Sequence, residues 1–168
     1  MMQTQEAEFV LRAPEPEDLD ALLALSNAHT REVGTIAREA FAELVVLSFR
    51  TRMTPTRNAF LIALADRAPP IAPNYRWFAE RFERFVYVDR VVVAERARGR
   101  GLGRLLYRDL IDAALGAGRV TLCCEVNVDP PNPASDAFHL ALGFSEIGRA
   151  FLPDRGKTVR YLVRDLAT

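Results

Sequence analysis

One stretch constrains the fold of this chain more than any other: an apolar run, a glycine-rich turn and an amphipathic segment that follow one another. Residues 87–93 are rich in valine and tyrosine, which favour β-strands, and the consecutive valines indicate a strand buried on both faces. Leucine and alanine then recur every three or four residues from Leu102 to Ala117, which predicts a helix with one apolar stripe. The chain therefore contains a strand, a tight turn and a helix in direct succession.

The turn between this strand and this helix has the composition of a phosphate-binding corner. Its glycines are Gly99, Gly101 and Gly103, and the arginines among them are Arg98, Arg100 and Arg104. Glycine permits positive φ angles and a close approach of the backbone to a ligand. The first amides of a helix lack intrahelical acceptors, and arginine adds charged donors that suit phosphate oxygens. The alternative is a solvated glycine turn with arginines on its surface.

The spacing excludes two common phosphate motifs. The glycines do not form G-x-G-x-x-G, and no G-x-x-x-x-G-K-[ST] occurs, so neither a Rossmann dinucleotide site nor a Walker-type NTPase is supported. Residues 98–103 instead match [QR]-x-x-G-x-[GA]. Residues 132–144 match N-x-x-[AS]-x-x-[LF]-Y-x-x-x-G-F, except that His139 stands at the tyrosine position. With both blocks, the chain resembles the GNAT superfamily of acetyl-CoA-dependent N-acetyltransferases.

The residue patterns and the resemblance together predict the fold class. The expected strands are 9–12, 44–50, 58–65, 87–93, 119–127, 144–152 and 157–166, and the expected helices are 16–28, 36–43, 101–117 and 132–142. The resemblance implies an α/β (α+β) GNAT fold with a single central mixed sheet of about seven strands and about four helices, splayed at the cofactor cleft. We expect one N-acetyltransferase-like domain over residues 1–168, with a flexible N-terminus over residues 1–8.

Composition argues against several other classes of protein. The formal net charge is zero, so no basic excess points to a nucleic-acid partner. No apolar run approaches the roughly 20 residues that span a bilayer, and the polar N-terminus is unlike a signal peptide, so we expect no membrane partner and a cytoplasmic location. Cys123 and Cys124 are the only cysteines and are neighbours in a predicted strand, which indicates neither a disulfide nor a metal site.

The resemblance implies acetyl-CoA as the cofactor. Its pyrophosphate would lie on the backbone of the glycine turn, and its pantetheine arm would pair with the edge of the valine strand like an added strand. Phe138 and His139 would flank the arm near the thiol. The full expected set is Val91, Val92, Val93, Arg98, Gly99, Arg100, Gly101, Leu102, Gly103, Arg104, Asn132, Ser135, Phe138 and His139.

Direct attack of an amine on a thioester requires a neutral amine, a stabilised oxyanion and a proton for the leaving thiolate. Alternation places Tyr87, Asp89, Val91 and Val93 on one strand face, and Asp89 is the only carboxylate among them. We therefore predict Asp89 as the base, directly or through a water, with Tyr87 as a substitute. A purely structural ion pair between Asp89 and a nearby arginine, such as Arg90 or Arg119, is the alternative.

His139 is the candidate acid, because histidine has an unperturbed pKa near 6.5 and replaces the tyrosine of the family pattern. Ser135 lies one helical turn earlier and would orient the ring. Alternatively, the ring only packs against pantetheine, and water protonates the thiolate. A further alternative is a GNAT-fold CoA-binding or interaction module without transferase activity, in which His139 marks a lost acid.

Three residues are candidates for contact with the acceptor amine. Asn27 and His29 belong to a polar cluster after the first helix, a region that lines the acceptor side in the resembled superfamily. Trp77 lies in an aromatic segment before the central strand, which we interpret as a substrate wall or as packing on the sheet. An open groove would favour a protein N-terminus, whereas a pocket closed by Trp77 and Phe78 would favour small amines. The resemblance also makes a homodimer plausible, and the transferred group is acetyl or a longer acyl chain.

Overall fold

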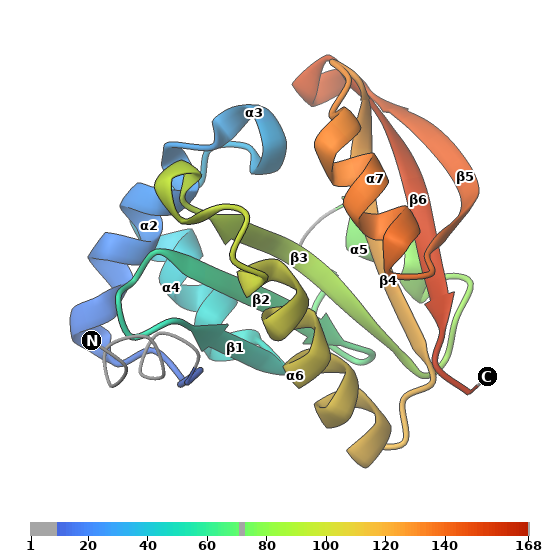
Figure 1. Ribbon diagram of the computed structural model, residues 1–168. Helices are drawn as coiled ribbons and strands as arrows, with labels where there is room; N and C mark the ends of the chain where they lie inside the picture. Colours follow the sequence, from blue (N-terminus) through green and yellow to red (C-terminus); the bar gives the residue numbers. More distant parts are fainter. Residues whose placement is uncertain (1–9, 71–72, 168) are drawn as a thin grey trace.

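Six strands form one mixed sheet at the centre of the computed structural model, which describes residues 10–70 and 73–167 (Figure 1). The strands are β1 (Arg50–Met53), β2 (Ala59–Ala65), β3 (Phe85–Val93), β4 (Thr121–Asp129), β5 (Ser145–Leu152) and β6 (Lys157–Asp165). Their order across the sheet is β1-β2-β3-β4-β6-β5. β3 and β4 pair in parallel, and the other neighbours in this sheet pair antiparallel. The parallel pair follows from the helical crossover that the sequence predicts between these two strands.

Helices cover both faces of the sheet (Figure 1). One face carries α6 (Leu102–Gly116) and α7 (Pro133–Ala141), and the other carries α2 (Leu19–Asn27), α4 (Arg38–Leu47) and α5 (Pro73–Ala79). A four-residue helix, α3 (Thr30–Val33), follows α2, and short 3-10 helices form η1 (Pro16–Asp18), η2 (Glu95–Ala97) and η3 (Pro153–Arg155). The apolar stripe predicted for α6 is confirmed, because Leu102, Leu106 and Leu110 are buried against the sheet. Within residues 10–70 and 73–167, no helix has the length and apolar character of a membrane span.

The strand predicted over residues 44–50 is wrong, because the apolar residues there continue a helix. Phe41 and Leu44 lie three residues apart and are both buried on the face of α4 that contacts the sheet. Val46 is 82% exposed, so the run of apolar residues is not buried throughout as a central strand would be. β1 therefore begins only at Arg50.

The strand predicted over residues 9–12 is reduced to one bridge between Arg12 and Met53. Phe9 lies outside the described residues, as does the flexible terminus that the sequence predicts over residues 1–8. The six strands and this bridge account for the expected mixed sheet of about seven strands. The single mixed sheet with helices on both faces that the sequence predicts is confirmed.

A β-bulge at Asp89 divides β3 into two parts. Val88 and Arg90 pair with neighbouring residues of β2, so Asp89 is the extra residue in the ladder. The prediction that Tyr87 shares a strand face with Val91 and Val93 is wrong. Tyr87 packs in the core beside α5, whereas Val91 packs in the core beside α6. The extra residue reverses the alternation of side chains beyond the bulge.

β3 and β4 separate after a short parallel contact. They pair over three positions, and the last of these joins Tyr87 to Cys123. β3 stays paired with β2 as far as Val93, and β4 stays paired with β6 as far as Asp129. The splay that the resemblance implies is therefore confirmed. Beyond the contact, neither strand is paired with the other, and a gap opens through the sheet (Figure 1).

Candidate active site

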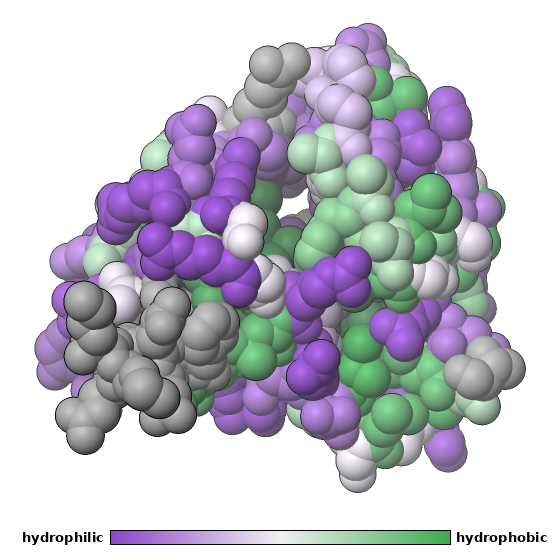
Figure 2. Space-filling model, in the orientation of Figure 1, coloured by the Kyte–Doolittle hydropathy of each residue, from purple (hydrophilic) through white to green (hydrophobic). Residues whose placement is uncertain are grey.

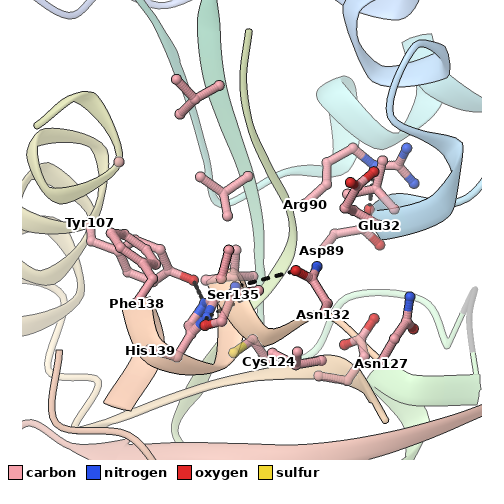
Figure 3. A pocket seen from close by; sticks show the side chains of 18 of the residues that line it. Glu32, Asp89, Arg90, Tyr107, Cys124, Asn127, Asn132, Ser135, Phe138 and His139 are labelled. Atoms are coloured by element: carbon pink, nitrogen blue, oxygen red, sulfur yellow. Dashed lines mark hydrogen bonds and ion pairs between the residues drawn. The ribbon is translucent and has the colours of Figure 1, made fainter. Parts of the chain in front are cut away.

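A cavity of about 540 Å³ occupies the gap between β3 and β4. Its walls come from the separated ends of both strands, from the glycine turn and the start of α6, and from α7. At the other end the cavity is lined by α3 and by the segment from η3 into β6. Figure 2 shows the surface hollowed between the two halves of the molecule, and Figure 3 shows side chains that line the cavity.

The glycine turn presents backbone donors to this cavity. Gly99 and Gly101 adopt φ angles of 80° and 77°, which L side chains rarely take. Gly101 is the N-cap of α6 and provides no side-chain cap, and the amide of Leu105 donates to its carbonyl. The amides of residues 102–104 therefore have no intrahelical acceptor. This backbone matches the phosphate-binding corner predicted from the sequence.

Two of the three arginines of the turn line the cavity. Arg98 and Arg104 belong to the lining, whereas Arg100 does not. The Nε atom of Arg98 lies 3.4 Å from the carbonyl oxygen of Val93, a long hydrogen bond that ties the turn to the end of β3. The two cations and the helix amides give this end of the cavity a positive potential that suits phosphate groups.

Gly103 provides space for α7. A Cβ atom at this position would lie 2.9 Å from the Cζ atom of Phe138, closer than side chains normally approach. Phe138 lines the cavity, so the missing side chain of Gly103 lets α7 close one wall. Asn132 also lines the cavity, and its Oδ1 accepts the amide of Ser135 at 3.3 Å, which confirms the predicted N-cap.

The edge of β3 that faces β4 carries amides pointing into the gap. The amide of Ala94 donates to the carbonyl of Asn58 next to β2, at 2.7 Å. Donors alternate in direction along an antiparallel strand, so the amides of Val91 and Val93 point away from β2. Both valines line the cavity, whereas Val92 is buried in the opposite core. The predicted edge for an added strand is therefore present at Val91 and Val93.

The predicted base, Asp89, forms an ion pair. Its Oδ2 accepts from the Nε of Arg90 at 2.8 Å, and the side chains are only 12% and 8% exposed. Arg90 also donates to the hydroxyl of Ser26 at 2.8 Å. The structural alternative stated for Asp89 is thus present in the fold, with Arg90 as its partner, while Arg119 pairs with Asp66. Asp89 lines the cavity but is held by this pair.

Sequence reasoning missed the carboxylate on the opposite wall, Glu125 of β4. It lines the cavity and is partly buried, and its Oε2 accepts the hydroxyl of Tyr87 at 2.7 Å. Burial raises the pKa of Glu125 to about 7; the hydrogen bond from Tyr87 opposes this shift and the charge of Asp89 adds to it. Burial also raises the pKa of Tyr87 well above 10, so its hydroxyl is a neutral donor. The available signal was a lone acidic residue inside an apolar strand.

The ring nitrogens of His139 contact Ser135 and Tyr107, and the hydroxyl oxygen of Ser135 lies 3.2 Å from Nδ1. Nδ1 lies 2.8 Å from the carbonyl oxygen of Ser135, which only accepts, so we place the ring proton on Nδ1. Nε2 then accepts the hydroxyl of Tyr107 of α6, at 2.7 Å (Figure 3). Burial lowers the pKa of His139, with the Ser135 carbonyl and the charge of Asp136 opposing the shift. Both His139 and Tyr107 line the cavity.

The predicted acceptor contacts lie elsewhere. Asn27 donates to the carbonyl of Ile36 at 3.2 Å and accepts its amide at 3.1 Å, which fixes the loop around α3. His29 Nδ1 lies 2.9 Å from the carbonyl oxygen of Leu25. Neither residue lines the cavity, whereas Glu32 and Val33 of α3 do.

Trp77 also lies outside the lining of the cavity. Its ring stacks on Tyr161 of β6, with centroids 4.1 Å apart and planes at 15°, and the guanidinium of Arg81 covers it at 3.7 Å. Its indole lies so close to Gly148 that a Cβ there would be 2.8 Å away. This is the packing alternative stated for the aromatic segment, and Trp77 does not close the cavity.

Comparison with known proteins agrees with this geometry. Residues 70–144 match the family model described as acetyltransferase (GNAT) family. NAA60 from Arabidopsis thaliana in complex with acetyl-CoA superposes with a TM-score of 0.75 at 14% identity, over 95% of this chain and 99% of that chain. The ribosomal-protein-S18-alanine N-acetyltransferase from Escherichia coli superposes with a TM-score of 0.67 at 19% identity, over 94% of this chain and 93% of that chain. The ribosomal-protein-alanine N-acetyltransferase from Brucella melitensis superposes with a TM-score of 0.68 at 22% identity, over 94% of this chain and 99% of that chain. No curated protein sequence matches this chain.

The family model covers residues 70–144, and the solved structures share the fold of almost the whole chain. The family match bears out the resemblance stated from the sequence, and NAA60, which shares the fold, binds acetyl-CoA, the cofactor that the resemblance implies. The residues of the cavity fit that group, because the helix amides, Arg98 and Arg104 suit its pyrophosphate. The amides of Val91 and Val93 suit its pantetheine arm.

Replacement of Gly101 by alanine should weaken acetyl-CoA binding at least about tenfold, because alanine at a φ of 77° is strained by roughly 1–2 kcal/mol and moves the free amides. Isothermal titration calorimetry with acetyl-CoA measures this loss. Gly116→Ala is the matched control, since its Cβ would meet nothing within 4 Å at the far end of the same helix. Equal affinities for the two variants would contradict the assignment of the turn.

Proposed function

We propose that the protein is an N-acetyltransferase that moves the acetyl group of acetyl-CoA to a primary amine by direct attack in a ternary complex. The observation that carries this proposal is Glu125, a cavity carboxylate with a pKa of about 7 across the gap from the unpaired edge of β3. The N-acetyltransferases that share the fold support transfer to an amine. The alternative of a CoA-binding module without transferase activity predicts binding of acetyl-CoA without turnover.

Glu125 has the properties of the base. Amines are protonated at neutral pH, and a protonated amine cannot attack a carbonyl. A carboxylate with a pKa of about 7 is ionised in part of the population at neutral pH and accepts a proton more readily than an ordinary glutamate. Tyr87 holds one carboxylate oxygen in place. We therefore assign the role proposed for Asp89 to Glu125, and we assign Asp89 and Tyr87 to positioning.

The edge of β3 supplies the polar donors of the reaction. When bound, acetyl-CoA supplies a thioester whose carbonyl oxygen gains negative charge during the attack. The amides of Val91 and Val93 point into the same gap and are fixed by the pairing of β3 with β2. Fixed donors stabilise developing charge without reorganisation.

Tyr107 is our candidate for the proton donor to the leaving thiolate. His139 occupies the position at which the family pattern has tyrosine, and both of its ring nitrogens have hydrogen-bond partners. A phenol nevertheless reaches the cavity at this place, from Tyr107 of α6. We propose that the hydroxyl of Tyr107 turns from Nε2 of His139 toward the thiolate to give up its proton, so that His139 holds the phenol in place and does not act as the acid itself.

A homodimer and a cytoplasmic location stay predictions from the sequence. β5 is the last strand of the sheet, with one edge that no described strand covers. The resemblance suggests pairing through the last two strands, and the molar mass in solution measures it directly.

Glu125→Gln should lower kcat/KM about 100-fold or more, because the amide cannot accept the amine proton. In the parent, the rate should rise with pH through about 7, where Glu125 ionises. In the variant, the rate should still rise with pH as the acceptor amine loses its proton, but the additional rise near pH 7 should be absent. Thiol release between pH 5.5 and 9 measures both profiles. A larger loss in Asp89→Asn than in Glu125→Gln would return the role of base to Asp89.

The same substitution should stabilise the fold at alkaline pH. Glu125 titrates near about 4.3 in the unfolded chain and about 7 in the folded protein, so the folded state holds the extra proton between these values. The free energy of unfolding of the parent therefore falls as pH rises from about 4 to 7, by up to about 4 kcal/mol. Urea unfolding at pH 5 and pH 8 should show Glu125→Gln gaining stability over the parent at pH 8. An equal difference at both pH values would contradict the raised pKa.

Tyr107→Phe should lower kcat about tenfold to 100-fold with little change in the Kd for acetyl-CoA, because only the proton donor is removed. Steady-state kinetics and calorimetry separate the two effects. Tyr75→Phe is the control, since that phenol is buried outside the cavity and binds the backbone of Ala65 and Ala68. Unchanged kcat in Tyr107→Phe, or equal losses in both variants, would contradict this role.

A further inference from the structure

Three side chains of α5 share one face of the helix and contact the same tyrosine of β6. Asn74, Trp77 and Phe78 are three and four residues apart, the spacing of neighbours on a helix surface. Trp77 stacks on Tyr161, and the ring of Phe78 lies 5.2 Å from that of Tyr161 with the planes at 84°. The Oδ1 of Asn74 accepts the hydroxyl of Tyr161 at 3.0 Å. Two rings and one hydrogen bond therefore fix α5 on Tyr161.

Tyr161 also brings Asn74 to Glu125. Glu125 and Tyr161 are partners in the antiparallel pairing of β4 with β6, so their side chains leave the same face of the sheet. α5 covers that face and contacts β4 (Figure 1). The side chain of Asn74 forms a hydrogen bond with the carboxylate of Glu125. Asn74 lines the cavity but is only 3% exposed. A buried chain of hydrogen bonds thus leads from β6 through α5 to the candidate base.

The two partners of the Asn74 amide determine its orientation. An ionised carboxylate only accepts hydrogen bonds, so the NH2 group must face Glu125. The carbonyl oxygen then faces Tyr161, whose hydroxyl donates to it. Burial raises the pKa of Tyr161, so this phenol keeps its proton at neutral pH. In the reverse orientation the carbonyl oxygen would face the carboxylate with no proton between them.

We propose that Asn74 is a positioning residue for Glu125, and that the hydroxyl of Tyr161 keeps the amide of Asn74 in the donating orientation. The carboxylate then has two side-chain donors, Tyr87 from β3 and Asn74 from α5. A carboxylate has about four acceptor sites, so two fixed donors leave sites for the amine proton. This inference rests on the proposed role of Glu125 as the base. It gives the aromatic segment of α5 a part in the site, because Trp77 holds Tyr161.

The hydrogen bond from Asn74 favours the ionised form of Glu125. It lowers the pKa of Glu125, against the larger effect of burial, and removal of the donor should therefore raise that pKa above about 7. The charge of Asp89 acts in the same direction as burial. The other titratable groups near Glu125 are neutral at pH 7, because burial raises the pKa of each: Tyr87, Tyr107, Tyr161, Cys123 and Cys124.

Asn74→Leu removes the donor and keeps a side chain of similar size. Protein labelled with 13C-glutamate is titrated between pH 5 and 9, and NMR follows the carboxyl carbon of Glu125, identified by its absence in Glu125→Gln. We expect Asn74→Leu to raise the pKa of Glu125 by about one unit, the effect of losing one hydrogen bond to a charged group. An unchanged pKa would overturn the inference and leave the N-acetyltransferase function standing.

Tyr161→Phe keeps the ring that stacks on Trp77 and removes only the hydroxyl. It should raise the pKa of Glu125 by less than Asn74→Leu does, and the double variant should match Asn74→Leu alone, because Tyr161 acts through Asn74. No shift in Tyr161→Phe, or an additive shift in the double variant, would overturn the role of Tyr161.

Tyr75→Phe is the matched control for the loss of a hydroxyl. Tyr75 is a buried phenol of the same helix, and its hydroxyl binds the backbone of Ala65 and Ala68, so the pKa of Glu125 should not move. Thermal melts by circular dichroism confirm that each variant is folded.

Kinetics tests whether this positioning matters for the transfer. Thiol release from acetyl-CoA is measured at pH 7 and pH 9 with 2-phenylethylamine, spermidine and glycinamide as probe acceptors. A rise in the pKa of Glu125 from about 7 to about 8 lowers its ionised fraction about fivefold at pH 7 and hardly at all at pH 9. Relative to the parent, kcat/KM of Asn74→Leu should therefore fall about fivefold at pH 7 and recover at pH 9. An equal loss at both pH values would overturn the positioning role.

The remaining failures are distinguishable. A raised pKa of Glu125 in Asn74→Leu, without the recovery of kcat/KM at pH 9, would overturn Glu125 as the base and the inference with it. Binding of acetyl-CoA without thiol release for any amine would overturn the proposed function, whereas the titration of Glu125 would still decide whether Asn74 holds the carboxylate.

Discussion

The separation of β3 from β4 is the constraint on which the site depends. The two strands share three parallel pairs, and each then continues with its own antiparallel partner. The bulge at Asp89 falls just after the shared pairs, and bulges increase the local twist of a strand. The sheet thus consists of two antiparallel parts joined at one end. Because backbone donors must find partners, the unpaired edge of β3 is suited to an extended ligand.

The same gap sets the electrostatics of the site by bringing two carboxylates to one cavity. Asp89 forms an ion pair with Arg90, and the bulge lets the side chains of these two consecutive residues lie side by side. Burial and the charge of Asp89 raise the pKa of Glu125 to about 7, and the hydrogen bond from Tyr87 only partly opposes this shift. Two carboxylates in different environments take different roles, a common basis for acid and base chemistry at one pH. In the proposed mechanism, the carboxylate paired with Arg90 has a positioning role and the carboxylate that binds the phenol accepts the proton.

Local sequence patterns predicted the elements around the glycine turn well. The glycine spacing, the apolar stripe of α6 and the N-cap at Asn132 depend on residues close in sequence. Cys123 and Cys124 also face different cores, as alternation requires. The faces of β3 were predicted wrongly because a bulge depends on pairing with β2, which no local pattern records.

The acceptor side was predicted less well for a related reason. Asn27 is polar because it fixes the loop around α3, and Trp77 is aromatic because it stacks on β6. Both roles are structural and produce the same residue types as a binding site. The role proposed for Glu125 depends on its distance from Tyr87 and on its place beside the gap, neither of which a local sequence pattern records.

The histidine at position 139 shows how a site can keep a chemical group while changing the residue that the family pattern records. A motif comparison identifies the tyrosine as missing and suggests a module that has lost its acid. In the fold, α6 and α7 meet closely because Gly103 has no side chain against Phe138. That contact lets Tyr107 reach across to the ring of His139 and line the same cavity. The phenol is therefore supplied by α6 in place of α7, and the substitution at position 139 by itself is no argument for an inactive site.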